Sequence, residues 1–220
     1  MIRAAFSILG FVFLVSCAAP QEKMTSHKDL ENIETIMVMP FQTMRAVDGS
    51  RFPVDCSFCN RRHTFEEVPE EASEFMTEHL KELLISDKAY RFVFPDRTDG
   101  MISRLQPDEN GIVTMSDLLA LSGNATSVDA VLLGYLFRFK ERVGTRYSVE
   151  SPASVFFSLF LVRVADERVV WRGTFEETQQ SLSENLLKIG AFIKRKARWV
   201  TAGEMAAEAL ENLMSTFPKP

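Results

Sequence analysis

The chain has 220 residues, of which 46% are hydrophobic and 25% are charged, with a formal net charge of -5 and three cysteines. This composition is typical of an ordinary globular domain and argues against a disordered chain, a disulfide-rich miniprotein and a polytopic membrane protein. The acidic balance argues against a nucleic-acid-binding protein, which would carry a basic excess.

A short apolar segment opens the chain and ends in a cysteine. Arg3 precedes an almost unbroken apolar run over residues 4–15, which suits the core of a signal peptide but falls short of the roughly 20 residues of a membrane-spanning helix. The tetrad Leu14-Val15-Ser16-Cys17 resembles the lipobox of bacterial lipoproteins. The resemblance implies cleavage before Cys17 and acylation of its thiol and its new amino group. The alternative is an ordinary signal peptide that is cleaved near Ala18 and Ala19.

The lipobox divides the chain into a signal peptide over residues 1–16, a lipidated cysteine with a polar tether over 17–31, and one periplasmic domain over 32–220. The acyl chains on Cys17 would hold the protein on a membrane, because each buried methylene contributes about 0.8 kcal/mol. Ala18 directly follows the lipidated cysteine. In enterobacterial lipoproteins an Asp at this position retains the protein in the inner membrane, and here that Asp is replaced by Ala. The resemblance therefore implies an outer-membrane lipoprotein that faces the periplasm.

The first half of the domain shows a strand, a loop and a helix in its hydrophobic pattern. Residues 33–41 are β-branched and apolar and predict a buried strand, which Pro40 ends. A loop is expected over 42–67. Pro69, with glutamates around it, opens an amphipathic helix that reaches about Ser86. One stripe of that helix is expected to face the core: Ala72, Phe75, Met76, Leu80, Leu83 and Leu84.

The middle of the chain predicts a short strand over 90–94, a loop over 96–113 and a short helix over 114–121 that starts with a capping box. A long strand follows over 128–143. We expect one face of that strand to carry Val131, Leu133, Tyr135, Phe137 and Phe139, while the other face turns polar at Arg138 and Lys140.

Two further strands and two helices complete the domain. Strands over 153–165 and 168–178, joined by a tight turn at Asp166-Glu167, predict an antiparallel meander with the preceding strand. Ser181-Leu-Ser-Glu184 and Thr201-Ala-Gly-Glu204 both match the capping box of a helix. The expected fold is α/β of the α+β kind, a single mixed sheet with the order β-α-β-α-β-β-β-α-α, whose meander is covered by helices.

Cys56 and Cys59 form a Cys-x2-Cys motif four residues before His63. In an oxidising envelope the two thiols can form a local disulfide, which would stabilise the fold by only about 2 kcal/mol. Together with His63 they also offer three ligands for Zn2+, which another histidine or a carboxylate would complete. A third interpretation is a pair of free or redox-active thiols. The sequence leaves all three open.

A basic run precedes the last predicted helix, with Lys194, Arg195, Lys196 and Arg198 beside Trp199. These cations could contact anionic lipid head groups, peptidoglycan carboxylates or an acidic partner protein. The simpler interpretation is a solvated loop between two helices, with Trp199 folded onto the core.

No catalytic motif emerges from the sequence. It contains no Gly-x-Ser-x-Gly elbow, phosphate-binding loop, dinucleotide fingerprint or His-Glu-x-x-His pattern, and it has only three histidines. We therefore expect no enzyme activity and no cofactor other than the lipid on Cys17, apart from the Zn2+ of the metal interpretation.

With this order of elements, the chain resembles a group of bacterial envelope lipoproteins that share the fold of the curli secretion lipoprotein, the penicillin-binding-protein activator lipoprotein and the amino-terminal domain of TolB. The resemblance covers roughly residues 33–217. It rests on four stretches: Met39-Pro40-Phe41, the leucines over 80–84, Val128-Asp129-Ala130, and the residues over 169–173.

The resemblance implies a protein that acts by binding, because members of this group assemble pores or dock on a synthase or on other envelope proteins. We expect a membrane-anchored, non-catalytic assembly or interaction module with an envelope protein as its partner. One alternative is a metal- or thiol-dependent protein that uses Cys56, Cys59 and His63. Another is a component of an oligomeric secretion pore, against which the charges of Arg138, Lys140, Glu141 and Arg142 argue.

Overall fold

The structure is a computed structural model, and it describes part of the chain. The described residues are 30, 32–43, 53–56, 61–64, 68–94, 128–145, 149–179 and 199–219, and for 53–56 and 61–64 the description covers the backbone alone. The signal peptide, Cys17, the tether up to residue 29, and the helices expected over 114–121 and after Ser181 lie outside these residues.

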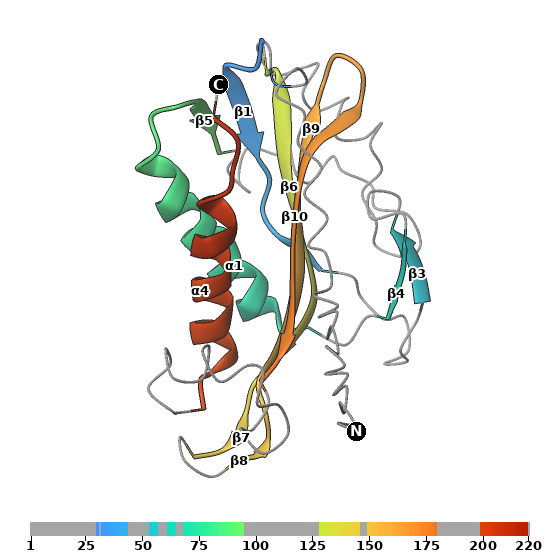
Figure 1. The fold of residues 1–220 in the computed structure, drawn as a ribbon, viewed down its shortest axis with the longest axis vertical. Coiled ribbons are helices and arrows are strands. Elements are labelled where there is room, and N and C mark those ends of the chain that lie inside the picture. The colour runs from blue at the N-terminus through green and yellow to red at the C-terminus, as the bar shows by residue number, and fades with distance from the viewer. Residues whose placement is uncertain are drawn as a thin grey trace, which may run out of the picture.

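A mixed six-stranded sheet forms the centre of the described domain, with the order β10-β9-β6-β1-β5 and with β2 also paired to β6 (Figure 1). The strands are β1 (Thr35–Val38), β2 (Gln42–Thr43), β5 (Arg91–Val93), β6 (Ala130–Lys140), β9 (Ser154–Arg163) and β10 (Arg168–Thr178). β1 runs parallel to both β5 and β6, whereas β6, β9 and β10 pair antiparallel. The predicted carboxy-terminal meander is thereby confirmed.

Helices α1 (Glu70–Ile85) and α4 (Ala202–Met214) lie side by side on one face of this sheet (Figure 1). α1 starts directly after Pro69 and ends before Ser86, as predicted. The capping box of α4 is present in full: the N–H of Glu204 donates to Thr201 Oγ1, and the N–H of Thr201 donates to Glu204 Oε2, each over 3.0 Å.

Two small hairpins are absent from the predicted element order. They consist of β3 (Pro53–Cys56) with β4 (Arg61–Thr64), and of β7 (Val143–Gly144) with β8 (Val149–Ser151). The prediction of a continuous loop over 42–67 is therefore wrong. Strands of two to four residues are too short for an alternating hydrophobic pattern to identify them. The described residues contain two helices, so the expected order with four helices is not borne out.

A β-bulge at Phe137 changes which side chains of β6 share a face. The pairing of β6 with β9 shifts register between residues 136 and 138, so that Phe137 and Arg138 both lie against Phe156. The extra residue turns Phe139 towards the helices, where its ring centroid lies 6.4 Å from that of Phe75. The expectation that Phe139 shares the face of Phe137 is wrong for this reason.

The core lies between the sheet and the two helices. Its large buried members include Ile36, Met76, Leu80, Leu132, Phe157, Leu161, Trp171 and Leu210. Gly134 and Gly173 permit this packing, because a Cβ at Gly134 would lie 2.8 Å from the Phe41 ring and a Cβ at Gly173 would lie 2.4 Å from Leu213 Cδ2. Met37, Val131, Leu133 and Phe160 are also buried, although alternation along their strands places them on the sheet face opposite the helices.

Candidate functional site

The Cys-x2-Cys motif belongs to the β3–β4 hairpin. Cys56 is the last residue of β3 and pairs with Arg61, while His63 of β4 pairs with Val54. Cys59 lies in the connection over 57–60, outside the described residues. The hairpin therefore holds the backbones of Cys56 and His63 on two neighbouring strands. Among the residues that the structure describes, no group of three or more His, Cys, Asp and Glu side chains could hold a metal ion.

The basic residues Lys194, Arg195, Lys196 and Arg198 lie outside the described part of the chain. The structure describes the residues that follow them, where Trp199 is half-buried and Val200 is buried. The N–H of Val200 donates to Oε1 of the buried Gln179 over 2.9 Å. Val200 and Gln179 thus fix the chain to the core just before α4.

Asp129 joins the start of β1 to the start of β6. Its Oδ2 accepts hydrogen bonds from the N–H groups of Glu34 (3.0 Å) and Thr35 (2.8 Å), and its own N–H donates to the carbonyl of Thr35 over 3.0 Å. The carbonyl of Asp129 accepts from the N–H of Val164 (2.9 Å). The Val128-Asp129-Ala130 motif therefore has a structural purpose, because its aspartate satisfies backbone donors that the strand ladder leaves open.

The motif Met39-Pro40-Phe41 ends β1 against helix α1. Pro40 has no N–H to continue the ladder, and the backbone of Phe41 pairs with the helix instead. Ser73 Oγ donates to the carbonyl of Phe41 over 2.6 Å, and the N–H of Phe41 donates to Thr77 Oγ1 over 2.9 Å. Both helix hydroxyls therefore position the chain between β1 and β2.

At the other helix, Glu141 contributes to the first turn. The N–H of Ala202 donates to Glu141 Oε2 over 3.1 Å, in addition to the capping box of Thr201 and Glu204. A carboxylate at this point also meets the positive end of the helix macrodipole. The polar strand end after β6 thus fixes the position of α4.

Two buried tyrosines show perturbed titration. Burial raises the pKa of Tyr135. Burial, and to a smaller extent the nearby Asp87 carboxylate, raise the pKa of Tyr90. Both phenols are therefore less acidic than the side chain of an exposed tyrosine.

The surface of the helix layer carries a feature that the sequence analysis missed. Phe75 was expected in the core stripe of α1, but 40% of its area is exposed. Its ring stacks almost parallel on His79, with an interplanar angle of 3° and centroids 6.0 Å apart. His79 Nδ1 lies 3.7 Å from Glu82 Oε2, and His79 Nε2 lies 3.9 Å from Glu211 Oε1 on α4. The signal that could have revealed this site is the spacing of the glutamates of α1, because Glu71, Glu78 and Glu82 share one stripe of the helix with Phe75.

No helix within the described residues is long and apolar enough to cross a bilayer. No family model matches the sequence, and no curated protein matches it.

Several solved structures are similar to this chain. PelC from Paraburkholderia phytofirmans, a dodecamer, is 10% identical with a TM-score of 0.45 over 83% of this chain and 86% of that chain. The lipoprotein GNA1162 from Neisseria meningitidis is 13% identical, with a TM-score of 0.37, and the match covers 74% of this chain and 98% of that chain. The LpoB C-terminal domain from Salmonella enterica is 13% identical, with a TM-score of 0.39, and the match covers 69% of this chain and 91% of that chain.

The chain is structurally similar to these proteins, of which GNA1162 is a lipoprotein.

Proposed function

We propose that this protein is a membrane-anchored bacterial lipoprotein whose α+β domain is a non-catalytic assembly or interaction module of the cell envelope. The observation that carries the proposal is the lipobox Leu14-Val15-Ser16-Cys17 at the end of a short apolar run. Lipid on Cys17 anchors the mature chain in the outer membrane, and the domain faces the periplasm. Its partner is another protein of the envelope.

The use of polar side chains in the domain supports a binding role. Asp129, Ser73, Glu141 and Gln179 each bind a backbone group of another element. These contacts rigidify the sheet and its two helices, and a rigid scaffold presents a surface to a partner with little loss of conformational entropy.

The topology gives an anchored domain a preferred orientation. β1, β6 and β10 run in the same direction, and the chain enters β1 from Leu30 at one end of the sheet, whereas α1 and α4 begin at the opposite end (Figure 1). A random coil with the length of the expected tether over 17–31 would have an average end-to-end distance of about 20 Å. An eleven-residue strand such as β6 is about 35 Å long. The end with Leu30 therefore stays nearer the membrane, and the helix N-termini point away from it.

Cross-linking in intact bacteria tests this function. The wild-type chain is expected to give discrete cross-linked products with an envelope protein, and Cys17→Ala is expected to lose them because the domain is no longer held at the membrane. A chain that gives no cross-linked product above the background of an unrelated lipoprotein would contradict an interaction module.

A second candidate is a metal- or thiol-dependent envelope protein, which the pairing of the strands of Cys56 and His63 favours. Thiol titration with and without a chelator separates its three forms: thiols that react freely, thiols exposed by the chelator, and thiols that react only after reduction. Unchanged folding and phenotype in the double variant Cys56→Ser, Cys59→Ser would remove this candidate.

A further inference from the structure

The exposed ring of Phe75 is held in place on the surface of the helix layer. It stacks on His79 of its own helix and meets Phe139 of β6 edge-on. On the side of α4, a Cβ built at Gly203 would lie 3.8 Å from Phe75 Cζ, so the ring reaches the first turn of that helix. Three elements thus fix the ring, which makes it a preformed aromatic platform rather than a side chain that samples many rotamers.

Carboxylates surround this platform. Glu71, Glu78 and Glu82 lie four residues before, three after and seven after Phe75, so helical geometry places all three on its stripe of α1. Together, α1 and α4 contain eight glutamates but only one lysine. That lysine, Lys81, lies 3.6 Å from Glu78. The helix layer is therefore strongly negative around an exposed aromatic ring.

We propose that this Phe75 surface (Phe75 and His79 with Glu71, Glu78 and Glu82) is a docking site for a cationic protein segment. The proposal rests on the proposed function, in which the domain acts by binding. Carboxylates attract Lys and Arg and raise the rate of encounter. The exposed part of the ring can contact a guanidinium or ammonium group and the aliphatic stem of that residue.

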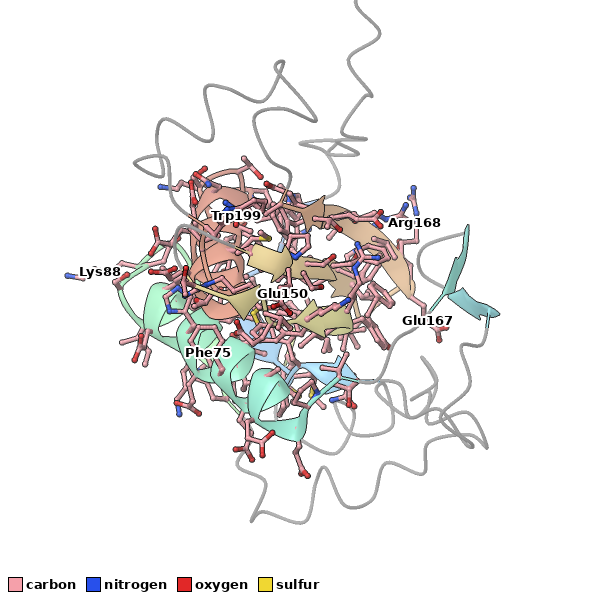
Figure 2. The ribbon with its side chains drawn as sticks, turned by 90° about the horizontal axis from the view of Figure 1, so that it is seen from below. Phe75, Lys88, Glu150, Glu167, Arg168 and Trp199 are labelled. Atoms are coloured by element: carbon pink, nitrogen blue, oxygen red, sulfur yellow. The ribbon has the colours of Figure 1, made fainter. Side chains whose placement is uncertain are left out.

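The charge and the position of the surface select the kind of partner. An anionic lipid head group would be repelled by the glutamates of α1 and α4, so the occupant is a protein segment rather than the membrane surface. Figure 2, which views the molecule from below, shows Phe75 on α1. Phe75 is in the first half of that helix, on the side of the end of the sheet at which α1 and α4 begin, and the proposed orientation turns this end towards a partner in the periplasm.

A labelled peptide with the sequence of residues 194–199 is a suitable probe, because it combines four cations with an aromatic residue. Its fluorescence anisotropy is measured with the full-length protein in a neutral detergent, and protein-free micelles serve as the blank. We expect saturable binding whose Kd rises at least about fivefold when the salt concentration increases from about 0.05 M to 0.3 M.

Matched variants locate the binding on the surface. Phe75→Ala and the double variant Glu71→Lys, Glu78→Lys are each expected to weaken binding by about fivefold or more. Ile85→Ala is the control, because Ile85 is 65% exposed on the same helix but lies at its other end. A peptide with Gln in place of Lys and Arg is expected not to bind. Circular dichroism checks that each variant is folded.

Several outcomes would overturn the proposal. The first is that the peptide shows no saturable binding to the wild type. The second is that Phe75→Ala binds the peptide as tightly as the wild type. If the charge-reversed double variant alone loses affinity, the attraction is non-specific. Self-association of the full chain that Phe75→Ala abolishes would make the occupant a second copy instead. Cys17→Ala is expected to bind the peptide like the wild type, so failure of this proposal is distinguishable from failure of the membrane anchor.

Discussion

Strands β1, β2 and β5, which lie parallel to β6, have two to four residues each, whereas β6, β9 and β10 of the antiparallel meander have ten or eleven. The meander pairs β6 with β9, which follows the β7–β8 hairpin along the chain, and β9 with β10 across a tight turn. It buries β6 and β9 almost continuously, whereas β10 is buried at three positions. The parallel part instead depends on side chains that bind backbone groups, notably Asp129, Ser73 and Thr77. Both parts bury hydrophobic side chains, because β1 is completely buried as well. The meander, here called the hydrophobic half, has the longer buried strands, whereas the parallel part, here called the polar half, also depends on these specific polar contacts.

The strongest test of the hydrophobic half is Phe157→Ala in β9. Phe157 is fully buried between the rings of Phe41 and Phe175. We expect the free energy of unfolding to fall by about 3–5 kcal/mol, because truncation removes buried area and leaves a cavity. Denaturant unfolding measures this loss, and a change below about 1 kcal/mol would show that the meander does not depend on this packing.

Removal of the aspartate that joins β1 to β6 tests the polar half. Asp129→Ala leaves the N–H groups of Glu34 and Thr35 without their acceptor, so we expect a loss of about 2–3 kcal/mol. Asp129→Asn keeps a side-chain acceptor and should lose less than half as much. Equal stability of the Ala and Asn variants in chemical denaturation would contradict this role.

A smaller effect is expected at the contact between β1 and α1. Ser73→Ala removes the donor to the carbonyl of Phe41 in a buried environment and should cost about 1–2 kcal/mol. Hydrogen exchange should show the loss of protection first in β1 and only later in β9. Simultaneous loss in both strands would mean that the two halves of the sheet unfold as one unit.

The smallest effect concerns the turn between β9 and β10. Hydrogen bonds from Arg163 hold the pKa of the exposed Asp166 carboxyl below its ordinary value. The stabilisation is therefore present above the ordinary pKa of Asp and is lost as the pH falls through the lowered pKa of the folded state. Asp166→Asn should reduce the Tm slightly at pH 7 and leave it unchanged near pH 2, and thermal melts at both values check this.

The sequence was most informative where a single local pattern decides the structure. The stripe of α1 and the capping box of Thr201 and Glu204 predicted both described helices, and alternation predicted the meander. The bulge at Phe137 could not be predicted, because an extra residue in a ladder depends on the partner strand. The β3–β4 hairpin was missed because its strands have four residues each, too few for hydrophobic alternation to identify them.

The candidate surface shows a similar limit. Spacing placed Phe75 on the apolar stripe of α1, and nothing in that spacing distinguishes a core residue from one at the edge of the stripe. How much of the ring is covered depends on the position of α4, whose Gly203 approaches it, and on Phe139 of β6, and neither contact can be read from the spacing within α1. Cys17, Cys56, Cys59 and the basic run over 194–198 stay predictions from the sequence.

The most direct test of the membrane-anchored module is the mass of the amino-terminal peptide of the protein isolated from bacterial membranes. We predict that the mature chain begins at Cys17 and carries diacylglycerol on its thiol and a third acyl chain on its amino group. An unmodified peptide that begins at Met1, or one that begins just after Ala19, would contradict the anchor.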